Sequence, residues 1–153
     1  MMVRPLVPGD IPACERVLRG LPDWFGVEAS VIEYVESLAT SAGFVATVDE
    51  EIAGFLGLKR HTAHASEVFV MAVGRDCHRQ GVGRALIGAT EAYLRKDAKL
   101  LQVKTLGPSH PDAGYARTRS FYLSMGFIPL EETSVIWGAE NPCLIMVKPL
   151  VSG

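Results

Sequence analysis

A strand, a glycine-containing turn and a helix are predicted in direct succession between residues 68 and 94, and this junction constrains the fold more than any other stretch. Val68–Val73 is an unbroken apolar run, the pattern of a strand covered on both faces, although a buried helical turn has the same periodicity. From Val82 onward, apolar residues recur at spacings of four and three, which line one face of a helix. The chain therefore turns from strand to helix at Gly81-Val82-Gly83.

The predicted turn is suited to binding an anion. Glycines let the backbone approach a ligand, and the first N–H groups of a helix lack intrahelical partners and carry the positive end of its dipole. Phosphate fits such a turn best. A Walker loop is excluded, because Arg84-Ala85 follows Gly83 where Lys and Ser or Thr are needed. A dinucleotide fingerprint is excluded too, because Leu86 occupies the place of its third Gly or Ala.

The six residues 78–83, His-Arg-Gln-Gly-Val-Gly, resemble motif A of the GCN5-related N-acetyltransferase (GNAT) superfamily. In that family (Arg/Gln)-x-x-Gly-x-(Gly/Ala) follows the fourth strand and binds the pyrophosphate of acetyl-coenzyme A. Both glycines match, and His78 stands where Arg or Gln is usual. Downstream, residues 121–127 resemble the family's motif B, FYxxxGF. The resemblance is specific because the strand, the turn, the helix and the second motif come in the family's order.

The resemblance implies an α/β fold of the α+β mixed-sheet kind. This GNAT fold has a central, mostly antiparallel sheet of six or seven strands, with the fourth and fifth strands splayed, flanked by about four helices. Sequence patterns predict strands at Met2–Val7, Phe44–Val48, Ile52–Leu58, Val68–Val73, Leu100–Leu106, Phe127–Ile136 and Cys143–Val147. They predict helices that begin at an Asp10 N-cap, at a Ser30 to Glu33 capping box, at Val82 and at Ala113.

Length and composition favour one soluble domain over residues 1–153. A formal charge of −2 gives no general attraction to nucleic acid or to an anionic membrane. No apolar run approaches the ~20 residues that span a bilayer, and the N-terminus lacks the apolar core of a signal peptide, so a cytoplasmic protein is expected. The three cysteines are widely spaced without clustered His partners, so neither a disulfide framework nor a metal site is expected.

The resemblance implies that acetyl-coenzyme A, as the acyl donor, binds at the turn and at the end of the fourth strand. An N–H near Met71 or Ala72 is expected to stabilise the oxyanion formed during acyl transfer, and Val73 to pair with the pantetheine arm. The pyrophosphate is expected at His78, Arg79, Gln80, Gly81, Val82, Gly83 and Arg84. Arg84 has an alternative interpretation as a solvated helix residue.

Two residues are expected to move protons. The tyrosine of motif B usually sits near the cofactor sulfur, and a phenol of pKa ~10 can donate to a thiolate whose thiol has a pKa of about 8.5, so Tyr122 is expected to be the general acid. Alternatively, Tyr122 only continues the apolar face of its helix. Many family members carry a glutamate base near the start of the fourth strand, where Glu67 stands. His64, His61 and a chain of waters are alternatives.

Acceptor specificity in this family usually lies between the first two helices and in the loop between the last two strands. Trp24, Phe25 and Trp137 are therefore expected to form an apolar or stacking wall for the acceptor. The alternative for Trp24 and Phe25 is that they pack the second helix onto the sheet.

The sequence therefore predicts an acyltransferase of the kind that transfers groups other than aminoacyl groups, here an N-acetyltransferase. An amine of small-molecule size is expected to attack the thioester directly in a ternary complex. Two alternatives stay open: a catalytically silent coenzyme A-binding sensor or interaction module, and a transferase directed at protein lysines or N-termini. A homodimer is expected through the edge of the last strand, Cys143–Val147, because exposed edges pair readily.

Overall fold

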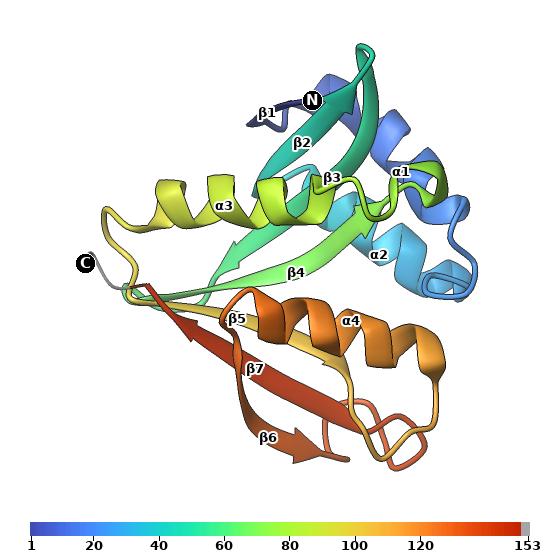
Figure 1. The fold of residues 1–153 in the computed structure, drawn as a ribbon, viewed down its shortest axis with the longest axis vertical. Coiled ribbons are helices and arrows are strands. Elements are labelled where there is room, and N and C mark those ends of the chain that lie inside the picture. Colours follow the sequence, from blue (N-terminus) through green and yellow to red (C-terminus); the bar gives the residue numbers. More distant parts are fainter. Residues whose placement is uncertain (151–153) are drawn as a thin grey trace. The chain divides into compact units, whose positions relative to one another are not determined.

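The computed structural model describes residues Met1–Leu150, which form two compact units (Figure 1). The first unit comprises Met1–Lys59 and Val68–Lys96, and the second comprises Arg60–Glu67 and the described residues from Asp97 to Leu150. Strand β4, Ala65–Val73, therefore begins in the second unit and ends in the first. The single-domain prediction also covers residues 151–153, which lie outside the described residues, and it stays a prediction.

The first unit is a sheet in the order β1-β2-β3-β4 with three helices. β1 and β2 pair antiparallel, as do β2 and β3. Asp49 and Glu50 join β2 to β3 with positive φ angles of 53° and 69°, the conformation of a two-residue type I′ hairpin turn. The strands besides β4 are β1 Met2–Pro5, β2 Ala42–Val48 and β3 Glu51–Arg60. The helices are α1 Ile11–Arg19, α2 Glu28–Leu38 and α3 Val82–Leu94.

The core of the first unit joins α1 and α2 to the sheet. Fully buried side chains include Leu18 of α1, Val45 of β2 and Phe55 of β3. Burial of large apolar side chains from helix and strand, at about 25 cal/mol per Å² of apolar surface, holds the helices on the sheet.

Asp10 is the N-cap residue of α1, as predicted, but without the expected side-chain bond, and α2 begins earlier than predicted. Asp10 does not cap α1 with its side chain; its carboxylate instead accepts hydrogen bonds from the Val7 N–H at 2.9 Å and from the Arg4 guanidinium at 2.8 and 2.9 Å. Helix α2 begins at Glu28, before the predicted capping box at Ser30. Glu28 accepts a hydrogen bond from Arg19 of α1 at 2.7 Å, a contact between the two helices that the local sequence pattern does not show.

The second unit contains strands β5 Leu100–Leu106, β7 Cys143–Pro149 and β6 Ile128–Thr133, in the order β5-β7-β6, with helix α4 at Ala113–Ser124. β7 pairs antiparallel with both β5 and β6. Both edges of β7 are therefore paired with other strands. The prediction that an exposed β7 edge forms a homodimer contact is wrong. β6 is the edge strand; it carries Pro129, a register shift between Pro129 and Glu131, and almost no buried side chain.

The predicted fold class is confirmed: the protein is a mixed α/β fold with a seven-stranded sheet and four α-helices among the described residues. β5 and α4 have the predicted bounds, whereas the sixth strand is shorter than the predicted Phe127–Ile136. Across residues 1–150, no helix is both long and apolar enough to cross a membrane.

Candidate active site

The turn between β4 and α3 has the backbone geometry that an anion site requires. Arg79 and Gly81 both adopt left-handed backbone conformations, with φ of 65° and 80°, and α3 begins directly afterwards at Val82. A Cβ added at Gly81 would meet no atom within 4 Å, so the space beside the turn is open. Upstream, the Gly74 N–H donates to the Ala53 carbonyl at 2.7 Å, which fixes the start of the turn to β3.

These features fit a bound pyrophosphate. The first N–H groups of α3 face out of the helix end without intrahelical partners, and the helix dipole favours negative charge there. Exposed Arg84 lies in the first turn of this helix and adds a positive charge. The residues predicted to bind the donor, from His78 to Arg84, therefore occupy one turn in the first unit, with Met71, Ala72 and Val73 in the strand that leads into it.

The loop between α1 and α2 packs against this turn. The Trp24 and His78 rings meet edge to face with centroids 5.8 Å apart, and the Arg75 guanidinium lies 3.5 Å from the Asp23 carboxylate. His78 Nε2 also lies 2.7 Å from the carbonyl oxygen of Val73. Trp24 thus contacts the predicted donor site, an association that the sequence did not indicate.

Phe25 and Trp137 have different environments. The Phe25 ring meets Tyr34 of α2 edge to face at 5.9 Å, and Trp24 and Phe25 both pack at the periphery of the core. This packing matches the alternative interpretation of the two residues, and an acceptor role for them stays a prediction. Trp137 belongs to the second unit, between β6 and β7, and its side chain is exposed.

Glu67 is the centre of a polar cluster in the second unit. The residue is only 6% exposed, although it carries a carboxylate. Three side chains converge on its Oε1 atom: His61 Nε2 at 2.6 Å, Gln102 Nε2 at 3.2 Å and Lys104 Nζ at 3.4 Å. A buried carboxylate needs such partners, because an unpaired one would lose its hydration without compensation.

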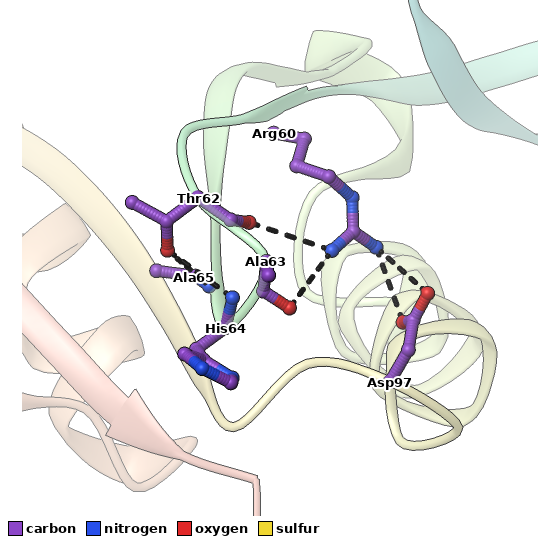
Figure 2. A network of polar contacts seen from close by, with 6 residues as sticks. All are labelled: Arg60, Thr62, Ala63, His64, Ala65 and Asp97. Carbon is purple, nitrogen blue, oxygen red and sulfur yellow. Dashed lines mark hydrogen bonds and ion pairs between the residues drawn. The ribbon is translucent and has the colours of Figure 1, made fainter.

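His61 belongs to a tight turn between β3 and β4, and Figure 2 shows the contacts of its neighbours in this turn. The N–H groups of His61 and Thr62 donate to the Ala65 carbonyl at 3.0 and 3.2 Å, and the Thr62 hydroxyl accepts from the backbone N–H of Ala65 at 3.1 Å. The Arg60 guanidinium donates to the Ala63 carbonyl at 3.3 Å and pairs with Asp97 at 3.1 Å. These contacts hold the turn in one conformation.

His64 lies in the same turn, but its contacts with the rest of the second unit are made by its backbone. Its carbonyl accepts hydrogen bonds from the N–H groups of Lys99 and Leu100 at 2.7 and 3.0 Å, and its own N–H donates to the Thr62 hydroxyl. The residue is exposed. Of the two histidines that the sequence offered as alternatives, His61 is the one in contact with Glu67.

Tyr122 is buried in α4. Its ring packs edge to face against Phe121 and Phe127, with centroids 5.4 and 5.3 Å away. Burial raises the pKa of the Tyr122 phenol above its ordinary value, and nearby Tyr115 adds to the effect. The hydroxyl therefore stays protonated throughout the neutral range, as a proton donor must, while the ring also fills the role in packing that was the alternative interpretation.

The cluster around Glu67 contains residues that sequence reasoning missed. Gln102 and Lys104 lie 35 and 37 positions after Glu67, on a different strand. The only sequence signal was their two-residue spacing, which places them on one face of β5.

Arg119 of α4 donates a hydrogen bond to the Leu106 carbonyl at 2.6 Å and so holds α4 to the end of β5.

Comparison with known proteins places the chain in a family. The family model for the acetyltransferase (GNAT) domain matches residues 39–129, more than half of the chain. The chain therefore belongs to the GNAT acetyltransferase family, and the predicted resemblance is confirmed. No curated protein sequence matches the chain.

Solved structures share the fold along almost the whole chain. A putative GNAT acetyltransferase from Desulfovibrio desulfuricans aligns with a TM-score of 0.85 at 21% identity, covering 98% of this chain and 99% of the other. The ribosomal-protein-S18-alanine N-acetyltransferase of Escherichia coli aligns at 0.79 and 20% identity, covering 99% and 95%. An aminoglycoside 6′-N-acetyltransferase complexed with coenzyme A aligns at 0.79 and 16% identity, covering 100% and 99%.

Proposed function

We propose that the protein is an acetyl-coenzyme A-dependent N-acetyltransferase, an acyltransferase that transfers groups other than aminoacyl groups, acting on an amine in a ternary complex. The observation that carries the proposal is the β4–α3 turn, in which Gly81 is left-handed at the start of α3 in a chain of the GNAT family. Such a turn presents helix N–H groups to a pyrophosphate. A similar structure holds coenzyme A, which supports the same donor here.

The donor supplies a thioester, whose carbonyl carbon an amine can attack. The turn from His78 to Arg84 would hold the pyrophosphate, and the main chain at Met71, Ala72 and Val73 would align the pantetheine arm and offer an N–H to the carbonyl oxygen. Binding by backbone groups explains why the chain tolerates His78 where Arg or Gln is usual in the family.

Two protons have to move during the reaction. The amine loses one as it becomes nucleophilic, and the buried cluster around Glu67 is proposed to receive it. The leaving thiolate gains one, for which Tyr122 of motif B is the proposed donor, because a phenol carries its proton at neutral pH. No covalent acyl-enzyme is required, because the amine attacks the thioester directly.

The acceptor is proposed to be a small-molecule amine, in a cytoplasmic protein without a nucleic acid or membrane partner. The formal charge of −2 favours a cationic amine over a polyanionic partner. A transferase acting on protein lysines or N-termini and a silent coenzyme A sensor are the outcomes that would replace it.

The test measures free-thiol release from acetyl-coenzyme A, with and without pooled polyamines, amino acids, aminoglycosides and short peptides. We expect release to rise with one amine pool and acetyl-coenzyme A to raise the melting temperature. Stimulation by peptides alone would make the protein-directed reading correct. A raised melting temperature without release from any pool would make the protein a sensor and overturn the proposal.

A matched pair of variants tests the donor site. Arg84→Glu places a carboxylate in the first turn of α3, where it suits the helix dipole but repels a pyrophosphate, so weaker donor binding is expected without loss of folding. Arg16→Glu makes the same charge change at an exposed position of α1 and should bind normally. Equal donor affinity in both variants would remove the turn as the pyrophosphate site.

A further inference from the structure

We propose that His61 is the catalytic base of this enzyme and that Glu67 is the residue that positions it, an inference that rests on the proposed acetyl transfer. The family resemblance put Glu67 in the role of base. The contacts around its carboxylate favour different roles for the two residues. The imidazole takes the proton, and the carboxylate orients the imidazole.

The Glu67 carboxylate is poorly placed to accept a proton from an amine. Its Oε1 atom already receives donors from His61, Gln102 and Lys104 at 2.6 to 3.4 Å. The side chain is only 7% exposed, which limits approach by a substrate. Lys104 also places a positive charge beside it, which repels an approaching ammonium.

The His61 ring has the opposite properties. Nε2 is 2.6 Å from the carboxylate, so the neutral ring donates its Nε2 proton there and leaves the Nδ1 lone pair unprotonated. The side chain is 34% exposed, which leaves the ring open to an acceptor. A carboxylate behind an imidazole fixes its tautomer and stabilises the imidazolium that forms when the free nitrogen takes a proton.

The turn that carries His61 is rigid enough to hold a catalytic group. Arg60 bridges the Ala63 carbonyl and Asp97, and Thr62 caps the N–H groups of His64 and Ala65 (Figure 2). Because backbone contacts hold the turn on both sides of His61, the ring is oriented before a substrate arrives, and that preorganisation favours proton transfer.

One proton passes from the amine nitrogen to Nδ1 of His61. The electron pair of the broken N–H bond stays on the amine nitrogen as the lone pair that attacks the thioester. The imidazolium then carries one positive charge against the Glu67 carboxylate and returns its proton to water. The other ionisable groups near this carboxylate are Lys104 on β5 and Cys143 on β7, and burial raises the pKa of the Cys143 thiol, which keeps it neutral.

The tautomer of the neutral His61 ring can be measured without any turnover. Long-range ¹H–¹⁵N NMR of the full-length protein should show the Nε2–H tautomer of His61 in the neutral ring. Glu67→Gln keeps an acceptor oxygen and should keep the tautomer, whereas Glu67→Ala should lose the preference. If the Glu67→Ala protein does not fold, the wild-type tautomer alone decides, and an Nδ1–H tautomer in the wild type overturns the proposal.

Kinetics then separate a catalytic from a structural role. His61→Ala should lower kcat by at least about a hundredfold, and added imidazole should restore part of it, while donor affinity stays unchanged. Glu67→Gln should lower kcat although the ring keeps its orientation, because the neutral amide no longer stabilises the imidazolium. Lys99→Ala, an exposed side chain next to the same turn, should leave kcat unchanged.

The outcomes distinguish this inference from the proposed function. If the wild-type protein releases no thiol with any amine, the proposed function fails and the base assignment falls with it. If the wild type is active and His61→Ala keeps its kcat, only the assignment of His61 is wrong. A large loss in His64→Ala, with none in His61→Ala, would move the base to the exposed histidine three residues along the turn.

Discussion

The imidazole of His78 contacts the backbone carbonyl of Val73 across the β4–α3 turn, with 2.7 Å between Nε2 and the oxygen. This hydrogen bond connects the last residue of β4 to the first residue of the predicted pyrophosphate motif. The bond occupies one lone pair of the Val73 carbonyl and leaves the second lone pair for a ligand.

His78→Ala should weaken coenzyme A binding. The hydrogen bond and the edge-to-face contact with Trp24 hold the turn in its binding conformation, and losing about 1 kcal/mol of this preorganisation corresponds to about a fivefold rise in Kd. Calorimetric titration with coenzyme A measures it, with His64→Ala as a control for loss of an exposed imidazole. Tighter binding by His78→Ala would instead show that the imidazole competes with the ligand for Val73.

Tyr122→Phe should lower kcat by at least about a hundredfold and leave donor affinity nearly unchanged, because the ring and its packing remain while the proton donor is lost. Since burial raises the pKa of Tyr122, its ionisation should cause no loss of kcat up to about pH 10. Steady-state kinetics across pH test both statements. Tyr93→Phe, at an exposed tyrosine of α3, is the control, and unchanged kcat in Tyr122→Phe would remove this residue as the acid.

Asp10→Asn should destabilise the fold at pH 7 and less so at pH 3. The Arg4 guanidinium and the Val7 N–H lower the pKa of Asp10 in the folded state, so the stabilisation is present above the ordinary pKa of about 3.9 and is lost as the pH falls through the folded value. The expected loss at pH 7 is about 1 kcal/mol, since solvent screens the exposed Arg4. Urea unfolding at both pH values measures it, with Glu33→Gln as control.

A pair of glycine substitutions tests the packing of β3. A Cβ at Gly57 would come within 2.6 Å of the Phe69 ring and 2.9 Å of Leu38, so Gly57→Ala should destabilise the protein by about 1–3 kcal/mol. Gly88 lies inside α3 with nothing within 4 Å, so Gly88→Ala should stabilise it by about 0.5–1 kcal/mol. Thermal unfolding compares the two, and equal effects would contradict the packing around Gly57.

The parts of the fold that the sequence predicts well are those set by local chemistry. Helix α4 and strand β5 have their predicted bounds, and the turn before α3 uses a left-handed glycine where the motif has one. Periodicity and turn residues determine these features within a few positions of the chain, so they are visible without knowledge of the partners.

Long-range contacts explain what the sequence did not show. The donors around Glu67 come from β5 and from the turn before β4, and only the folded arrangement brings them together. The same holds for the bond from Arg4 to the side chain of the predicted N-cap Asp10, and for the bond from Arg19 to Glu28 at the start of α2. The functional candidates stay predictions, and the proposed division of roles between His61 and Glu67 rests on a 2.6 Å contact that the sequence does not show.

Strand β6 has a consequence for the behaviour of the protein at high concentration. An edge strand offers its free backbone groups to any other chain, but here Pro129 removes one donor, the adjacent register shift interrupts the regular ladder, and Glu131 and Glu132 add negative charge. A second molecule that approached this edge would meet a broken hydrogen-bonding pattern and a like charge. This edge of the sheet should therefore resist the edge-to-edge growth that leads to fibres.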